Sequence, residues 1–161
     1  MGLLRSPTVL TLCKRINMKT IQEEYKDILK EEIAPRLRAI GFKGSGQNYS
    51  IPSESHWAFV GFQKSMRSNS EQIIFTINIF VISKEKWAKT REISSHLPEK
   101  PSSKTNLVTG WSKRIGELLP KAEDHWWTFD KKTEKDQLVS ELLEAIEKYS
   151  LPQIKTQIDN A

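Results

Sequence analysis

Apolar residues recur every three to four positions along residues 18–40, with glutamate and lysine between them. A period of about 3.6 residues places these apolar side chains on one face, so the segment predicts an amphipathic α-helix. Pro35 has no backbone N–H to donate inside that helix, and we expect a kink or break near residues 31–34. Gly41 then permits the helix to end.

The next three apolar segments have the character of β-strands. They lie at residues 47–51, 57–64 and 72–83 and are separated by polar turns at 52–55 and 67–70. Short separators of this kind predict an antiparallel meander. In the third segment both sets of alternating residues are mostly apolar, so we expect this strand to be central and covered on both faces.

The second half of the chain has weaker periodicity until its end. The elements that we expect there are a helical turn at 84–91, a loop to about residue 106, and short strands at 109–118 and 126–129. Apolar residues at helical spacing over 138–149 predict a second amphipathic helix, and Pro152 starts a final short one.

Together these elements predict one α+β domain over residues 18–161. We expect a mainly antiparallel sheet of about four to five strands, flanked by an N-terminal and a C-terminal amphipathic helix. Residues 1–17 are expected to be a disordered extension or the product of an upstream start codon, because Met18 stands directly before the first periodic segment. Their short apolar stretch follows Pro7 and precedes no small-residue cleavage site, so it makes a poor signal peptide. No apolar run in the 161 residues reaches the length of a membrane-spanning helix.

Charge and cysteine content bear on the partner and the compartment. The formal net charge is +5, but Arg5, Lys14 and Arg15 carry three of these charges, so residues 18–161 carry +2. Such a small excess does not indicate a cluster of phosphate contacts. The single cysteine, Cys13, cannot form an internal disulfide, which favours a reducing compartment and a cytoplasmic location.

Three polar residues in otherwise apolar strands are the first candidates for a site. Gln63, Asn78 and Arg114 each lie inside or at the end of such a strand. A buried amide or guanidinium is costly unless it is hydrogen-bonded, so these residues are either structural links or the lining of a pocket. Whether Gln63 and Asn78 share a face depends on the strand register, which the sequence leaves open.

The run Asp124-His125-Trp126-Trp127 is the second candidate. An Asp and a His can exchange protons only if their side chains meet, whereas neighbours in a strand point to opposite faces. We expect one indole to pack in the core and the other to cover the sheet edge or a groove. Exposed Trp together with Arg favours a protein interface, and it also permits stacking on unpaired bases.

No other pattern is typical of a metal, cofactor or nucleophile site. His56, His96 and His125 are scattered, without a paired ligand at helical spacing. Ser65 lacks the glycines of a nucleophile elbow, and Cys13 lies in the expected extension. We therefore expect no catalytic residue, no metal and no cofactor.

A set of short motifs in a fixed order resembles a known family. The motifs are Gly41-Phe42, Asn48-Tyr49, Gln63-Lys64-Ser65, Phe75-Thr76-Ile77-Asn78, Arg114-Ile115-Gly116 and Trp126-Trp127. Over about residues 18–154 the chain is similar to the bacterial domain-of-unknown-function family 4304. The resemblance implies an intracellular bacterial domain whose biochemical role is unassigned. Trp111 and Ser112 stand where that family often has His or Cys, so no role is carried over to these positions.

Three functions from different classes remain open at this point. The leading hypothesis is a non-enzymatic protein-interaction module, accessory or immunity-like, that binds another protein through Gln63, Asn78, Arg114, Trp126 and Trp127. The first alternative is a nucleic-acid-binding domain that uses Lys64, Arg67, Lys113 and Arg114. The second is a small hydrolase that uses Asp124 or His125.

Overall fold

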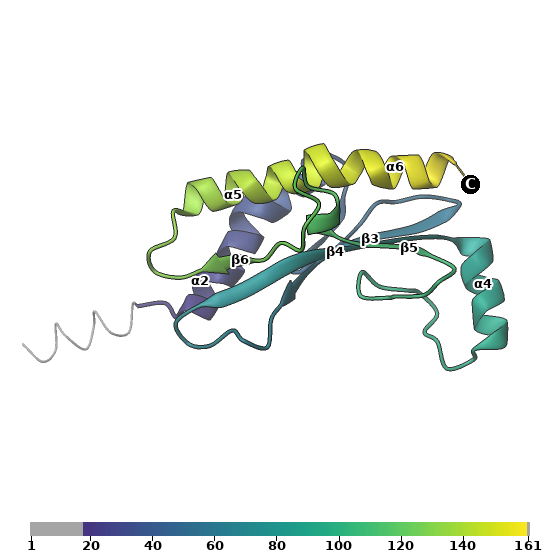
Figure 1. The fold of residues 1–161 in the computed structure, drawn as a ribbon, viewed down its shortest axis with the longest axis horizontal. Helices are drawn as coiled ribbons and strands as arrows, with labels where there is room; N and C mark the ends of the chain where they lie inside the picture. The colour runs from purple at the N-terminus through teal and green to yellow at the C-terminus, as the bar shows by residue number, and fades with distance from the viewer. Residues whose placement is uncertain (1–17, 161) are drawn as a thin grey trace, which may run out of the picture.

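Strand β4 (Ile73–Ser83) lies in the middle of a six-stranded sheet (Figure 1). A computed structural model of the chain describes residues 18–160, so the expected extension at 1–17 lies outside the described residues. Strand β3 (His56–Lys64) pairs antiparallel with β4 along its whole length. The predicted meander is confirmed, because β2 (Asn48–Ser50) pairs antiparallel with β3 in turn.

One short strand was not predicted. Strand β1 (Lys43–Ser45) pairs with β2 and forms the outer edge of the sheet. All three of its residues are exposed, so no alternation of apolar and polar side chains marks it in the sequence.

The other edge of β4 carries one strand that is interrupted. Strands β5 (Trp111–Arg114) and β6 (Trp127–Phe129) both pair antiparallel with this edge, β5 against residues 78–81 and β6 against residues 73–75. Between them, residues 115–126 leave the sheet opposite Thr76 and Ile77. We call this segment the excursion. The predicted strand at 109–118 is therefore wrong beyond Arg114, because the chain turns there into a 3₁₀ helix, η2 (Ile115–Glu117).

Two helical arms cover one face of the sheet (Figure 1). The first consists of α2 (Ile21–Asp27), the π-helical turn η1 (Ile28–Ile33) and α3 (Ala34–Ala39), and the second of α5 (Lys135–Glu144), the π-helical turn η3 (Ala145–Ser150) and α6 (Leu151–Asp159). Their apolar faces pack on alternate residues of β4, among them Phe75, Ile77 and Ile79, all fully buried. This confirms the amphipathic helices at both ends of the described chain. No helix within residues 18–160 is long and apolar enough to cross a membrane.

Each helical arm changes geometry directly before a proline. Pro35 and Pro152 both stand within the first two positions of an α-helix that follows a π-helical turn. A proline inside a regular helix would lose a backbone hydrogen bond and clash with the carbonyl four residues earlier, and a widened turn relieves both. The kink expected near Pro35 is confirmed in this form.

The opposite face of the sheet is only partly covered. Helix α4 (Lys84–Ile93), ten residues long where a single turn was expected, places Trp87 against Phe80 and Ile82 in a second, smaller core. The loop that follows α4 crosses the sheet at Gly61, where a Cβ atom would lie 1.9 Å from the Ser103 Oγ. The predicted cover on both faces of β4 is confirmed at its C-terminal end.

A buried histidine marks the junction between β3 and α4. His56 pairs with Ser83 in the sheet register, is 5% exposed, and its Nδ1 lies 2.7 Å from the Ser55 hydroxyl. Burial, and then the positive charge of Lys86, lower the pKa of this imidazole below its ordinary value of 6.5.

We predict that mild acid destabilises the domain through His56. The unfolded chain takes up this proton near pH 6.5 and the folded chain only at lower pH, so the stability present above pH 6.5 is lost as the pH falls below it. Urea unfolding between about pH 7.5 and pH 5 measures the slope. His56→Gln should flatten the slope, whereas His96→Gln, at an exposed loop position, should keep it. Equal slopes for His56→Gln and the unchanged protein would contradict this assignment.

Candidate functional site

A recess of about 600 Å³ opens on the sheet face that the two helical arms leave free. Its floor is formed by Gln63 and Asn78, and one wall by Ser112 and Arg114 of β5. The loop after α4 and the excursion complete the walls with Ser103, Lys104, Asn106, Glu117 and Asp124. We call it the sheet recess. It joins segments that lie far apart in the sequence.

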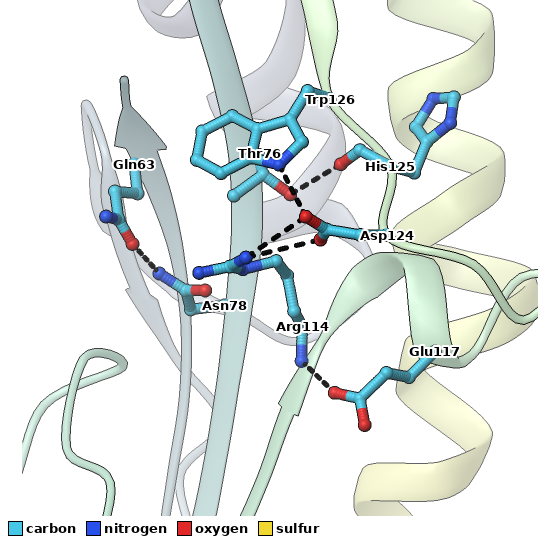
Figure 2. Close-up of polar contacts among 8 residues, drawn as sticks. All are labelled: Gln63, Thr76, Asn78, Arg114, Glu117, Asp124, His125 and Trp126. Carbon is cyan, nitrogen blue, oxygen red and sulfur yellow. Dashed lines mark hydrogen bonds and ion pairs between the residues drawn. The ribbon is translucent and has the colours of Figure 1, made fainter. Parts of the chain in front are cut away.

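The register of β3 and β4 places both floor amides on the same face. Gln63 stands opposite Thr76, and Asn78 stands opposite Gly61, two residues along each strand. Asn78 Nδ2 donates a hydrogen bond to Gln63 Oε1 (Figure 2). The two amides are therefore linked to each other and also line the recess. The sequence left a structural link and a pocket lining as alternatives, and both apply to Gln63 and Asn78.

Arg114 lies beside these amides because it stands opposite Asn78 in the β4–β5 register. Its Nη1 donates to both carboxylate oxygens of Asp124 at 3.3 Å, and its Cζ lies 5.1 Å from the centre of the Trp126 ring. Trp126 Nε1 in turn donates to Asp124 Oδ2 at 2.8 Å. We call these three residues the Arg114 cluster (Figure 2).

The cluster holds Asp124 in its ionised form. The hydrogen bond from Trp126, followed by the hydrogen bond and positive charge of Arg114, lowers the pKa of the Asp124 carboxyl. Because the carboxylate accepts from both neighbours, it fixes the guanidinium and the indole relative to each other. The Arg114 side chain remains 40% exposed, so this pairing leaves much of it in contact with solvent.

Glu117 secures the outer edge of β5. Its Oε2 accepts a hydrogen bond from the Arg114 backbone N–H at 2.8 Å, and its Oε1 lies 3.4 Å from the Lys113 ammonium. An unpaired backbone N–H at the edge of a sheet can attract another strand. The hydrogen bond to Glu117 satisfies the N–H of Arg114, so it is not available to one.

The excursion returns to the sheet through a close backbone contact. Gly116 is buried, and a Cβ atom there would lie 2.0 Å from the Glu123 carbonyl oxygen and 2.6 Å from the His125 nitrogen. Thr76 Oγ1 donates to the His125 carbonyl at 2.7 Å, in the gap between β5 and β6. The first and last residues of the excursion are thereby held together, which directs Asp124 and Trp126 toward Arg114.

The paired tryptophans point to opposite sides of the sheet. Trp126 lies over Arg114, whereas Trp127 is 6% exposed, stacks on Phe75 at 5.8 Å and donates to Glu141 at 3.3 Å on the helix-covered face. Of the five candidates, Gln63, Asn78 and Arg114 line the recess, and Trp126 contacts it only through Arg114 and Asp124. Trp127 does not contact the recess, because alternation along β6 turns it into the core.

Asp124 and His125 diverge for the same reason. The His125 ring packs edge-on against Trp127 at 4.5 Å, away from the Arg114 cluster (Figure 2). Their side chains do not form the converging acid–base pair that the hydrolase hypothesis requires.

The basic residues of the nucleic-acid hypothesis are likewise split between faces. Lys64 donates to Gln22 Oε1 at 2.9 Å and lies 5.2 Å from the Tyr25 ring, on the side of the helical arms. Arg114 lies on the other side, so these two cations do not share a surface. Within residues 18–160, no three His, Cys, Asp or Glu side chains are grouped to hold a metal ion.

Several residues of the recess were not candidates from the sequence. Ser103, Lys104 and Asn106 lie in a loop without periodicity, and only the chain crossing at Gly61 brings them to the sheet. Asp124 was a candidate as a partner of His125, not of Arg114. No local signal links it to an arginine ten residues earlier.

The fold and the site define an antiparallel α+β domain with a polar recess on its less covered sheet face. Residues 33–156, more than half of the chain, match the family described as Domain of unknown function (DUF4304). The chain belongs to this family, which confirms the resemblance in its motifs. No curated protein and no solved structure matches the chain.

We predict that Gly116→Ala destabilises the domain by about 1 to 3 kcal/mol, because the added methyl group overlaps backbone atoms that cannot move freely. Ala122, in the same excursion, has φ of 52°, so Ala122→Gly should leave stability unchanged or raise it. Urea unfolding measures both variants, and near-ultraviolet circular dichroism reports whether the packing of the tryptophans is kept. A Gly116→Ala variant as stable as the unchanged protein would show that the backbone contact is not needed.

Proposed function

We propose that this domain is a non-enzymatic, cytoplasmic interaction module that binds a segment of another protein in the sheet recess. An accessory or immunity-like protein that sequesters its partner would use such a module. The observation that carries the proposal is the Arg114 cluster at the wall of an open recess, with arginine and tryptophan already fixed by one carboxylate.

The size and the lining of the recess support a peptide as the ligand. A volume of about 600 Å³ lies within the range of ligand sites, which extends from about 300 to 1,000 Å³. Arginine and tryptophan are also the residues most often found to dominate the binding energy of protein interfaces. A polar, open recess beside them suits a flexible chain segment better than a drug-like apolar molecule.

The fixed geometry of the cluster supports tight binding for a small contact area. Ordering a free arginine side chain on binding costs conformational entropy. In this domain Asp124 and Trp126 already restrain Arg114, so part of that entropy is lost when the domain folds and not when the ligand binds. The divergence of Asp124 and His125 supports the non-enzymatic part of the proposal, and the single cysteine, Cys13, supports the reducing compartment.

Site-specific photo-crosslinking in the native cells tests this function. A photoreactive amino acid replaces Asn106, which is exposed and lines the recess, and in a matched variant it replaces Lys155, which is exposed on α6. We predict a discrete covalent adduct from position 106 and not from position 155. Protease should destroy the partner in this adduct and nuclease should not. Adding Arg114→Ala to the position-106 variant should remove the adduct.

Two outcomes would contradict the proposal. Identical adducts from positions 106 and 155 would place the contact outside the recess. An adduct whose partner is degraded by nuclease would favour a nucleic acid as the partner.

A further inference from the structure

Hydrogen-bond donors in the sheet recess outnumber the acceptors that they meet. Arg114 uses Nη1 on Asp124, but its Nε and Nη2 have no hydrogen-bond partner among residues 18–160. Within the same residues the ammonium of Lys104 and the hydroxyl of Ser112 also have none. A ligand that supplies oxygen acceptors would satisfy these groups.

Ser103 adds a donor that is almost enclosed. Its side chain is 6% exposed and lines the recess, and no group within residues 18–160 hydrogen-bonds to its hydroxyl. The hydroxyl is therefore free to donate to a ligand in the recess. The packing of Ser103 over Gly61 holds it in this position.

The two acids of the recess are already engaged. Asp124 accepts from Arg114 and Trp126, and Glu117 accepts from the Arg114 backbone and pairs with Lys113. The residues that line the recess include three cations, Lys104, Lys113 and Arg114, and these two carboxylates, which leaves an excess of one positive charge. One negative charge on a ligand would balance it.

We propose that the sheet recess binds a carboxylate, supplied by an acidic side chain of the partner segment. This inference rests on the proposed function, since the partner segment is the one that the recess accommodates. Arginine binds carboxylates through two parallel N–H···O bonds, and Arg114 has an Nε and an Nη2 free for such a pair. The Ser103 and Ser112 hydroxyls also line the recess and can donate to the remaining lone pairs.

The charge of the recess favours a carboxylate over a phosphate monoester. A phosphate monoester carries up to two negative charges at neutral pH, and Asp124 and Glu117 would repel the second one. A carboxylate carries one charge, which equals the excess.

Binding of simple probes to the purified full chain tests the inference. The probes are a short polyglutamate peptide with both ends capped, the matched polyglutamine peptide, and inorganic phosphate. We expect isothermal titration calorimetry to detect the polyglutamate peptide, with the other two at least about 10-fold weaker. Equal binding of polyglutamine, or stronger binding of phosphate, would overturn the inference.

Matched variants locate the interaction. Arg114→Gln and Lys155→Gln each remove one positive charge, but Lys155 is exposed on α6, on the helix-covered side. The first should weaken polyglutamate binding about 10-fold or more and the second less than about 2-fold. Equal effects would show that only net charge matters. Ser112→Glu keeps all three residues of the Arg114 cluster but adds a carboxylate beside the guanidinium, so it should also abolish polyglutamate binding. This variant tests the site even where Arg114→Gln does not fold.

Asp124→Asn gives a change in the opposite direction. The amide oxygen can still accept from Trp126, whereas the charge that competes for Arg114 is lost. Polyglutamate should bind about 2-fold to 5-fold more tightly. Weaker binding would contradict the charge balance of the recess and overturn the inference.

The binding experiment and the photo-crosslinking experiment can each give a negative result without the other. A protein adduct from position 106 without polyglutamate binding would leave the interaction module in place and remove the carboxylate. Polyglutamate binding without any protein adduct would keep the carboxylate site and remove the protein partner.

Discussion

Strand β4 must be shielded from water on both faces, and the arrangement of the whole domain follows from this constraint. Ile77 and Ile79 point to one face and Phe80 and Ile82 to the other, and all four are buried. A strand that is apolar on both faces requires a covering layer on each side. The two helical arms form one complete layer. On the other side, α4 and its loop cover only the end of the strand near Phe80, and Asn78, two residues further along, lines the open recess.

The recess is the uncovered remainder of this second face. Its polar lining agrees with its exposure, because Asn78 lies on the same strand face as buried Phe80 but outside the small core of α4. The interruption between β5 and β6 then brings a carboxylate and an indole to the edge of the recess. Without the excursion, a continuous edge strand would carry Arg114 but would offer neither Asp124 nor Trp126 to orient it.

The elements with a strong local period were predictable, and the contacts between them were not. Alternation identified β3 and β4, and the helical period with Pro35 identified the kinked N-terminal arm. Strand β1 was missed because all three of its residues are exposed. The excursion was missed because its closure depends on Gly116 meeting the backbone near Glu123, a contact that no local pattern encodes.

The residues of the candidate site were likewise only partly predictable from the sequence. Gln63, Asn78 and Arg114 stood out as polar residues in apolar strands, and the register joined them in one recess. The roles of Trp126 and Trp127 could not be separated in advance, since a shift of one residue in β6 would exchange them. Ser103 and Lys104 gave no signal, because a loop side chain acquires its neighbours only from the tertiary structure.

The interrupted edge strand also separates the part of the chain that maintains the architecture from the part that can diversify. Both ends of the excursion are anchored by strands paired to β4, and residues 120–122 at its tip are exposed. Insertions or replacements at this tip would reshape one rim of the opening while the hydrogen-bonded ladder on either side stays in register. Such a segment offers evolution a place to alter selectivity at little cost to folding.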